Sequence, residues 1–402
     1  MELGSGGNSH FGGRLTVKLQ DSQLKPSRTL NDYFGWVLTL YLTPKAPDSK
    51  TNTPSFIGNP LNTMFLPATV RSHMPIAFAL VLILTGLFAQ WVGRASPGNS
   101  SSDLSGYVDL VRWGKQQHFD AHWNAPVGEL TLSNRWSQWV FKADSKRADL
   151  DGGQLLLCFA SRIKNGSLHI SQLDVERSLR PLLSPPRLSP GKQIRTIAIG
   201  AGHGGKDPGK QSGKRQEKDY TLRLALELEQ QLLTAGFKVI QIRRSDEFVD
   251  LLDRPAIARR KGADVYVSLH YNSFSGPGSE TAKGAETYCL TPAGASSTND
   301  PDGHGGMPRM PANRFDSENL YLAWEIQRSI VSQTGVDDRG VRRARYLELT
   351  QMPIPAVLIE GGFMTHPDDA ALIWSAESRT QLAEAIRDGL LAYKRTLERE
   401  SP

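Results

Sequence analysis

The sequence has few cysteines: Cys158 and Cys289 are the only two in 402 residues. Each lies inside an apolar run, LLLCFA and ETYCL, so we expect two buried free thiols and no disulfide. No Cys-x-x-Cys pair occurs, which excludes a zinc site built from thiolates.

The chain also lacks a strong bias of charge. Its 47 basic and 41 acidic side chains give a formal net charge of +6, and the basic residues are scattered. Without a basic patch interleaved with aromatic residues, nucleic acid is not an expected partner. An anionic polymer or a membrane surface is compatible with this charge. The length and the 39% hydrophobic content are those of a globular protein of two or three domains.

The N-terminal region, residues 1–63, is rich in Gly, Ser, Asn, Thr and Pro. We expect it to be disordered, or to precede the true start of the protein at Met64. Residues 64–95 have the pattern of a signal peptide, with an apolar core from Ile76 to Ala89 and a small-residue cleavage site. Because this core is short for a membrane span, export with cleavage is the prediction. An uncleaved anchor and a buried core helix are the alternatives.

Two linkers divide the rest of the chain. The first, 96–102, precedes a small α+β module at 103–183, and the proline-rich second, 184–192, marks a domain boundary. Short strands, an Asn-Gly turn and a closing helix give the module a resemblance to the stalk module related to the copper amine oxidase N-terminal domain. Its expected elements are a helix at 107–113, strands at 129–132, 138–142 and 154–159, and a helix at 173–183.

From residue 193 to 398, strands and helices alternate, which predicts an α/β domain with a largely parallel sheet covered by helices on both faces. The helix at 220–235 is the clearest, because its leucines recur near a 3.6-residue period and Gly236 supplies a C-terminal stop. The other expected strands are at 195–200, 237–243, 264–270, 285–290 and 356–360. The other expected helices are at 253–261, 317–334 and 376–397. Ser317 is the expected N-cap of the helix at 317–334.

Four polar residues stand at the ends of these elements. His203 follows the first strand among glycines, in AGHGGKDPG, and His270 and Glu360 each end a strand. Open α/β sheets bind ligands beyond the carboxyl ends of their strands, so we expect these three side chains to lie together. Glu217, near the start of the helix at 220–235, is expected to fold back beside His203.

Two imidazoles and one carboxylate suit zinc, and they leave a fourth position for water, whose pKa falls to roughly 7. A second carboxylate must then move the proton, and Glu360 fits this role because a ligand carboxylate cannot easily act as the base as well. Structural interpretations are open for each residue. Glu217 alone is typical of an acidic first-turn residue favoured by the helix dipole. Glu360 follows four apolar residues, where an unpaired carboxylate is costly.

The other histidines give weaker signals. His118 and His122 are four residues apart, but no acidic residue stands between them as in His-Glu-x-x-His, and nearby aromatic residues favour packing. His304 lies in a Gly/Pro-rich loop at 291–315, and His366, before a proline, is expected to be solvated.

Seven segments, in order, resemble the zinc-dependent N-acetylmuramoyl-L-alanine amidases of the type 3 family. They cover about residues 194–396 and are AGHGGKDPG, QEKDYTLRLALELEQQLLTAGFKV, ADVYVSLHYNS, KGAETYCL, SENLYLA, DRGVRRARYLEL and PAVLIEGGFMTHPDD. The resemblance implies a mixed six-stranded sheet flanked by helices. It also implies one zinc ion held by His203, Glu217 and His270, with Glu360 as catalytic base. The implied reaction is hydrolysis of the amide between the lactyl group of N-acetylmuramic acid and L-alanine of the stem peptide.

This resemblance predicts a role in cell-wall remodelling or daughter-cell separation, with peptidoglycan as the partner. The expected location is the periplasm or cell envelope, or the inner membrane if the apolar segment stays attached. An envelope activator protein and an N-terminal membrane tether are further hypotheses about partners. A different zinc hydrolase is one rival function. A non-catalytic wall-binding or regulatory protein is another, although the presence of all four site residues argues against it.

The chain departs from the family pattern at four positions. Gly200 stands where Asp is common, so a carboxylate that supports the first histidine is expected to be missing or replaced. Tyr271 replaces a small residue and is expected to narrow the cleft, Gly361 replaces a larger apolar one, and His366 replaces Asn. The inhibitory helix that some relatives insert is not expected, and the cleft should be open, because the corresponding loop is short and carries Pro301, Pro308 and Pro311.

Overall fold

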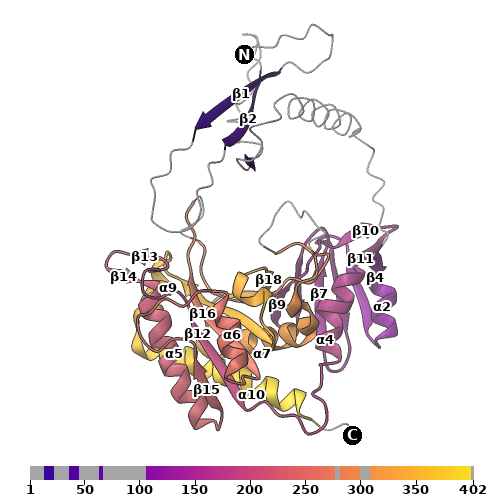
Figure 1. Cartoon of the computed structure of the whole chain (residues 1–402). Helices are drawn as coiled ribbons and strands as arrows, with labels where there is room; N and C mark the ends of the chain where they lie inside the picture. The colour runs from indigo at the N-terminus through magenta and orange to yellow at the C-terminus, as the bar shows by residue number, and fades with distance from the viewer. Residues whose placement is uncertain are drawn as a thin grey trace. The chain divides into compact units, whose positions relative to one another are not determined.

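The protein is described by a computed structural model that covers residues 13–21, 36–44, 63–66, 106–276, 281–298 and 308–399 (Figure 1). The chain divides into two compact units, residues 1–103 and 104–402. In the first unit an antiparallel sheet of order β1-β2-β3 is formed by β1 (Gly13–Asp21), β2 (Trp36–Pro44) and β3 (Thr63–Leu66). These strands lie in or beside the segment that composition predicts to be disordered.

Among the described helices, none is both long and apolar enough to cross a membrane. The predicted apolar core from Ile76 to Ala89, the rest of the signal segment beyond Leu66 and the linker at 96–102 lie outside the described residues. Signal peptide, anchor and linker therefore stay predictions.

The second unit is built on one sheet of order β15-β12-β16-β19-β17-β18-β9-β8-β7-β6-β5. β17 runs antiparallel to β19, and the other neighbouring pairs among the first six strands are parallel. The sheet has eleven strands rather than the expected six, and the expected mixed, mostly parallel six-stranded arrangement is confirmed as one part of it. Its strands are β15 (Lys238–Gln241), β12 (Thr196–Ala201), β16 (Val265–Asn272), β19 (Ala356–Phe363), β17 (Ala285–Leu290) and β18 (Asp338–Ala344).

Successive side chains of the central strands enter different cores. In β16, Val265, Val267 and Leu269 belong to the main hydrophobic cluster, whereas Tyr266 belongs to a smaller one, as the period of two in a strand requires. The main cluster is covered by α5 (Glu217–Thr234), α7 (Asp316–Thr334) and α10 (Ala376–Leu397), which also pack on one another (Figure 1). The smaller cluster receives side chains from α6 (Asp253–Arg260) and α8 (Leu347–Thr350).

Both faces of the central strands are therefore covered, which explains why β12, β16, β17 and β19 are rich in buried apolar residues. α9 (Pro367–Trp374) completes the helices by packing on β19 and α10. The predicted N-cap at Ser317 is wrong, because α7 begins at Asp316 and Phe315 is its N-cap.

The small module supplies the remaining five strands of the sheet and a separate three-stranded sheet of order β10-β11-β4. Its elements are β4 (Tyr107–Asp109), α2 (Leu110–Gln116), β5 (Asp120–Asn124), β6 (Glu129–Ser133), β7 (Gln138–Lys142), β8 (Arg147–Leu150), β9 (Gly153–Leu156), β10 (Arg162–Lys164), β11 (Ser167–Ser171), α3 (Gln172–Asp174), η2 (Val175–Leu179) and α4 (Arg180–Leu183). The prediction of a helix at 107–113 is wrong for residues 107–109, which form β4. Asp109 caps α2 by accepting from the backbone N–H of Arg112 at 3.0 Å.

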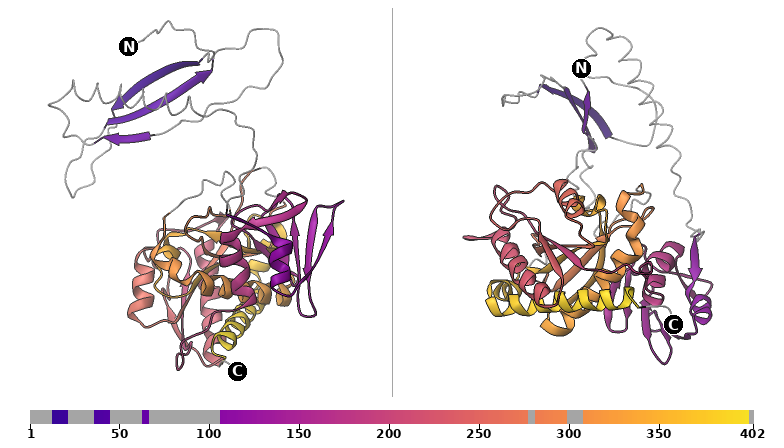
Figure 2. Two further views of the ribbon diagram at one scale, coloured as in Figure 1. Left: turned by 90° about the vertical axis from the view of Figure 1, so that its right-hand side faces the viewer. Right: turned by 60° about the horizontal axis from the view of Figure 1, so that its bottom comes forward.

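The module and the following α/β region share one sheet, as Figure 2 shows. β9 pairs with β18 in parallel, with Leu155 opposite Val341, and the N–H of Gln154 donates to Asp338 at 2.9 Å. The main hydrophobic cluster contains side chains from both regions. The proline-rich segment at 184–192 thus links two parts of one core, and the domain limits 103–183 and 193–398 stay predictions.

A shared core predicts that the two regions unfold together. Leu155 is fully buried in β9, so Leu155→Ala should lower the free energy of unfolding by about 2–5 kcal/mol. Urea unfolding followed by tryptophan fluorescence and by circular dichroism should give one coincident transition. Exposed Ile163→Ala should change the stability by less than about 0.5 kcal/mol. Two separate transitions, with only one shifted by Leu155→Ala, would contradict a shared core.

Candidate active site

The loop after β12 places His203 at the carboxyl end of the sheet. His203 has a φ of 60°, a left-handed conformation that is rare for residues with a side chain. The buried guanidinium of Arg243 holds this loop by donating to the carbonyl oxygens of Ala201 at 3.0 Å and Gly202 at 2.8 Å. A Cβ atom at Gly202 would collide with the ring of His270, so glycine lets the two histidines approach. Such strain persists only where the surroundings fix it, as Arg243 does here.

Glu217 is the first residue of α5 and follows a hairpin formed by β13 (Gln211–Ser212) and β14 (Arg215–Gln216). Its carboxylate is buried and accepts from the backbone N–H groups of Lys210 at 2.9 Å and Tyr271 at 3.1 Å. These bonds direct the side chain away from solvent and toward β16. Glu217 thus lies beside His203, where the sequence analysis expects it.

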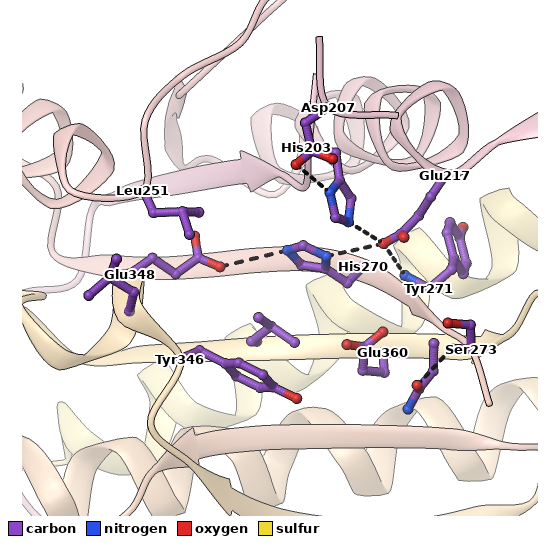
Figure 3. Close-up of a pocket in the computed structure, with 13 residues that line it drawn as sticks. His203, Asp207, Glu217, Leu251, His270, Tyr271, Ser273, Tyr346, Glu348 and Glu360 are labelled. Carbon is purple, nitrogen blue, oxygen red and sulfur yellow. Dashed lines mark hydrogen bonds and ion pairs between the residues drawn. The ribbon is translucent and has the colours of Figure 1, made fainter. Parts of the chain in front are cut away.

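The Glu217 carboxylate lies between two imidazoles (Figure 3). Its Oε1 is 3.0 Å from Nε2 of His203 and 3.1 Å from Nδ1 of His270. The ligand atoms of the three residues lie within 4.8 Å of one another, and no other such group of three occurs in the described part of the chain. His118 and His122 do not share a helix, because α2 ends at Gln116 and His122 lies in β5.

The charges in this group favour a cation. Burial opposes ionisation of Glu217, but hydrogen bonds from His203 and His270 outweigh it and hold the pKa of the carboxyl well below its usual range. Burial likewise opposes protonation of His270, yet the nearby carboxylates of Glu217 and Glu348 outweigh it and raise the pKa of the imidazole to about 10. A site that stabilises positive charge this strongly suits a divalent ion, and two nitrogens with one carboxylate oxygen form a donor set that zinc accepts.

Glu360 lies on β19, beside His270 in the register and opposite Glu286 of β17. Its Oε2 is buried, and no described residue lies within hydrogen-bonding distance of it. Burial, opposed by His270 and reinforced by the carboxylates of Glu217 and Glu286, raises the pKa of Glu360 to about 8. A buried, unpaired carboxyl group with a raised pKa, facing a cavity, is a candidate for proton transfer.

These side chains line one cavity with a volume of about 310 Å³. Figure 3 shows the Glu360 carboxylate on the strand next to His270, facing the same space as the three candidate ligands. Leu251 and Tyr346 line other parts of the cavity. In the described parts of the loop between β17 and α7, 291–298 and 308–315, the only helical element is the short η3 (Pro311–Phe315).

The structure explains the departure at Gly200. A Cβ atom at Gly200 would collide with the hydroxyl of Tyr266, so the phenol fills the space that a side chain would need. The carboxylate that the sequence analysis expects to be missing or replaced near His203 is supplied by Asp207, whose Oδ2 lies 2.8 Å from Nδ1 of His203.

Two other departures compensate each other. The ring of Tyr271 packs in the main core, where a Cβ atom at Gly361 would lie 3.1 Å from it. A larger side chain on β16 is thus matched by a smaller one on β19. The expectation that His366 is solvated is wrong: it is only 8% exposed and caps α9 by accepting from the backbone N–H of Asp368.

Several charged residues around the cavity, most of them buried, were not identified from the sequence. Glu286 accepts from Arg339, from the hydroxyl of Tyr288 at 2.6 Å and from the side chain of Asn272 at 3.1 Å. Glu348 on α8 is buried as well. For Glu348 the available signal was its position between Leu347 and Leu349, because a charged residue among apolar neighbours is rarely buried without a partner. The buried residues of this group are Arg243, Arg254, Glu286 and Glu348, and the half-buried ones are Asp207 and Arg339.

Comparisons with known proteins identify the family of the chain. A family model described as N-acetylmuramoyl-L-alanine amidase matches residues 197–392. The amidase AmiC of Neisseria meningitidis serogroup B is 29% identical over 259 residues, 58% of this chain and 61% of that protein. AmiA of Escherichia coli K12 is 28% identical over 234 residues, 52% of this chain and 80% of that protein. The uncharacterized protein YqiI of Bacillus subtilis 168 is 32% identical over 200 residues, 50% of this chain and 84% of that protein.

The fold and these similarities define a hydrolase of the α/β class. The chain belongs to the N-acetylmuramoyl-L-alanine amidases of the type 3 family. It spans less than two thirds of the length of the Neisseria amidase.

The contact between Gly200 and Tyr266 yields a prediction. Gly200→Ala should displace the phenol and lower the free energy of unfolding by about 1–3 kcal/mol, because the added methyl group overpacks a filled space. Tyr266→Phe removes only the colliding hydroxyl, so the double variant should lose less stability than the sum of the two single variants. Denaturant unfolding of the four proteins measures this coupling. Strict additivity would show that the phenol does not fill the space above Gly200.

Proposed function

We propose that the chain hydrolyses the amide bond between N-acetylmuramic acid and L-alanine in peptidoglycan, with one zinc ion held by His203, Glu217 and His270. Glu360 is the general base and acid. The observation that carries this proposal is the single cavity in which these three ligand groups meet beside the unpaired carboxyl of Glu360. Family membership supports the substrate and the bond.

Zinc, when bound, supplies Lewis acidity: it lowers the pKa of a water molecule and stabilises negative charge on the carbonyl oxygen. The protein's own residues carry the proton. Glu360, ionised, accepts a proton from the attacking water and then donates it to the nitrogen of the departing L-alanine. A positive charge at the His203, Glu217 and His270 group favours the ionised form of Glu360, because opposite charges nearby lower a carboxyl pKa.

The walls of the cavity are partly apolar. Leu251 and Leu358 line it beside the polar groups, so part of the substrate contact is apolar. Apolar walls strengthen each charge interaction inside by keeping the local dielectric low. We infer that a bound metal ion, rather than the bulk solvent, determines whether Glu360 is protonated or ionised.

The substrate implies a location. Peptidoglycan lies outside the cytoplasmic membrane, so the chain acts after export, in the periplasm or cell envelope. Export through the segment at 64–95, a membrane tether at the same place and an envelope activator protein are predictions from the sequence.

Two rival functions differ in their products. Another zinc hydrolase, such as a peptidase or deacetylase, would release different fragments from the same substrate. A non-catalytic wall-binding protein would release none. Mass analysis of digested peptidoglycan separates the three, since only the amidase frees stem peptide with L-alanine at its amino terminus.

Metal content is the first test. The wild-type chain should bind about one zinc ion, measured by inductively coupled plasma mass spectrometry, and a chelator should abolish release of stem peptide. His270→Ala should lose both zinc and activity, because it removes one of three ligands. His122→Ala, on a strand of the module, should retain both. Unchanged turnover after verified removal of the metal would refute zinc dependence.

Glu360→Gln is the second test. It keeps the shape of the side chain but removes the proton acceptor, so kcat/KM on peptidoglycan should fall by about 10²–10⁴-fold while zinc content is retained. Glu377→Gln changes an exposed glutamate of α10 and should leave turnover unchanged. The role of Glu360 is wrong if both variants release stem peptide at the wild-type rate.

A further inference from the structure

Glu348 is a buried carboxylate that the proposed mechanism does not use. It lies on the short helix α8 and is only 2% exposed. Its Oε2 accepts from the hydroxyl of Tyr266 at 2.6 Å and lies 3.5 Å from Nη1 of Arg254, and its Oε1 accepts from the hydroxyl of Ser268 at 2.8 Å. Removing such a charge from water is expensive, so its position calls for a reason beyond folding.

The carboxylate faces the far side of a candidate metal ligand. Oε1 of Glu348 lies 3.7 Å from Nε2 of His270, whereas Nδ1 of the same ring faces Glu217 at 3.1 Å. Figure 3 shows Glu217 and Glu348 on opposite sides of the imidazole. Nε2 is buried, and no described group lies within hydrogen-bonding distance of it. Glu348 is the carboxylate placed to reach this nitrogen after a small shift.

Coordination chemistry makes this placement meaningful. A neutral imidazole that binds a cation through Nδ1 carries its proton on Nε2. In a buried site that N–H group needs an acceptor, and an acceptor there fixes both the tautomer and the orientation of the ring. A charged acceptor also raises the basicity of the ligating nitrogen.

We propose that Glu348 is a positioning residue of the metal site: it accepts the Nε2–H of His270 and thereby holds Nδ1 toward the ion. This inference rests on the proposed function only in assuming that His270 is a metal ligand. It adds a residue that acts through His270 and does not touch the substrate's reacting atoms.

The residues around Glu348 hold its carboxylate in a fixed orientation toward His270. Ser268 and Tyr266 precede His270 by two and four residues on β16, so all three side chains share one face of the strand. One strand therefore carries both the histidine and the two hydroxyls that orient the carboxylate. Arg254 lies near Glu348 and also donates to the carbonyl oxygen of His203 at 3.4 Å, so it links the supports of both histidines.

A purely structural role is the competing explanation. In that case Glu348 only anchors α8 to the sheet through Tyr266 and Ser268, and its loss would reduce stability without changing the metal. The two explanations differ in zinc affinity, which depends on the tautomer and orientation of His270.

The test measures zinc affinity of the full chain by competition with a chromogenic chelator, in the absence of substrate. Glu348→Gln keeps the shape and removes the charge, and Glu348→Leu removes the acceptor altogether. We expect zinc to bind about 10-fold more weakly to the first and about 100-fold more weakly to the second. Ser268→Ala removes only the hydroxyl that orients Oε1 and should give a smaller loss. The absorption spectrum of the cobalt-substituted protein should shift in the Glu348 variants, because the ligand field of His270 changes.

Asp174→Asn is the matched control. Asp174 is a fully buried carboxylate of the module that accepts from the backbone N–H of Cys158 at 2.8 Å and from the hydroxyl of Ser178 at 2.9 Å. Its loss should lower the melting temperature of the metal-free protein while leaving zinc affinity unchanged.

Two results overturn the proposal. In the first, the single variants Glu348→Gln and Ser268→Ala both bind zinc with wild-type affinity. In the second, Glu348→Gln and Asp174→Asn lose the same amount of zinc affinity. A selective loss in the Glu348 variants supports it. Because no substrate is present, a wild-type chain that binds zinc but leaves peptidoglycan intact would refute the proposed function and still give a result for Glu348.

Discussion

The Glu217 carboxylate joins three segments that are distant in the sequence. It begins α5, accepts from the backbone of β16 through Tyr271, and contacts the imidazole of His203 in the loop after β12. A carboxylate with both oxygens bound in this way has few accessible orientations. The geometry of the candidate metal site therefore depends on where α5 starts, and the hairpin of β13 and β14 before it determines that start.

Several charged side chains near this carboxylate are buried. Arg243, Arg254, Glu286 and Glu348 are each no more than 2% exposed, and each has several polar partners. In a low-dielectric interior a fully partnered network is rigid, whereas a half-partnered one is destabilising. Oε2 of Glu360 and Nε2 of His270 are among the buried side-chain atoms that have no hydrogen-bond partner in the described part of the chain, and their residues both line the cavity. Both atoms belong to residues to which the proposed function gives a role.

Sequence periodicity could predict the central strands and the long helices because they are apolar on the faces that they bury. Strands β12, β16, β17 and β19 and helices α5, α7 and α10 lie within a few residues of their expected limits. β18 could not be found in this way, since its sequence DRGVRRA carries three arginines. Arg343 is fully buried there because it donates to the carbonyl oxygen of Arg177 in the module at 2.7 Å. That contact exists only once β9 has extended the sheet, and no local pattern encodes it.

The same distinction applies to the candidate site. His203, His270 and Glu360 could be identified because glycines or strand ends mark them in the sequence, whereas Glu217 was identified from its place near the start of a helix and from the family resemblance. Glu348, in YLEL, has no such mark, because its environment is assembled from β16 and α6 rather than from its own helix.

Two of the departures from the family pattern are compensated by residues on neighbouring strands, which are distant in the sequence. Gly200 is matched by Tyr266, and Tyr271 by Gly361, each pair lying on neighbouring strands in contact. Volume exchanged within such a pair leaves the strand register unchanged, and the register determines that His270 and Glu360 stand side by side. Substitutions can therefore accumulate behind the site while its polar atoms keep their positions. An exchange that altered the register would instead turn these side chains to the opposite face, and the site would be lost even with every ligand residue present.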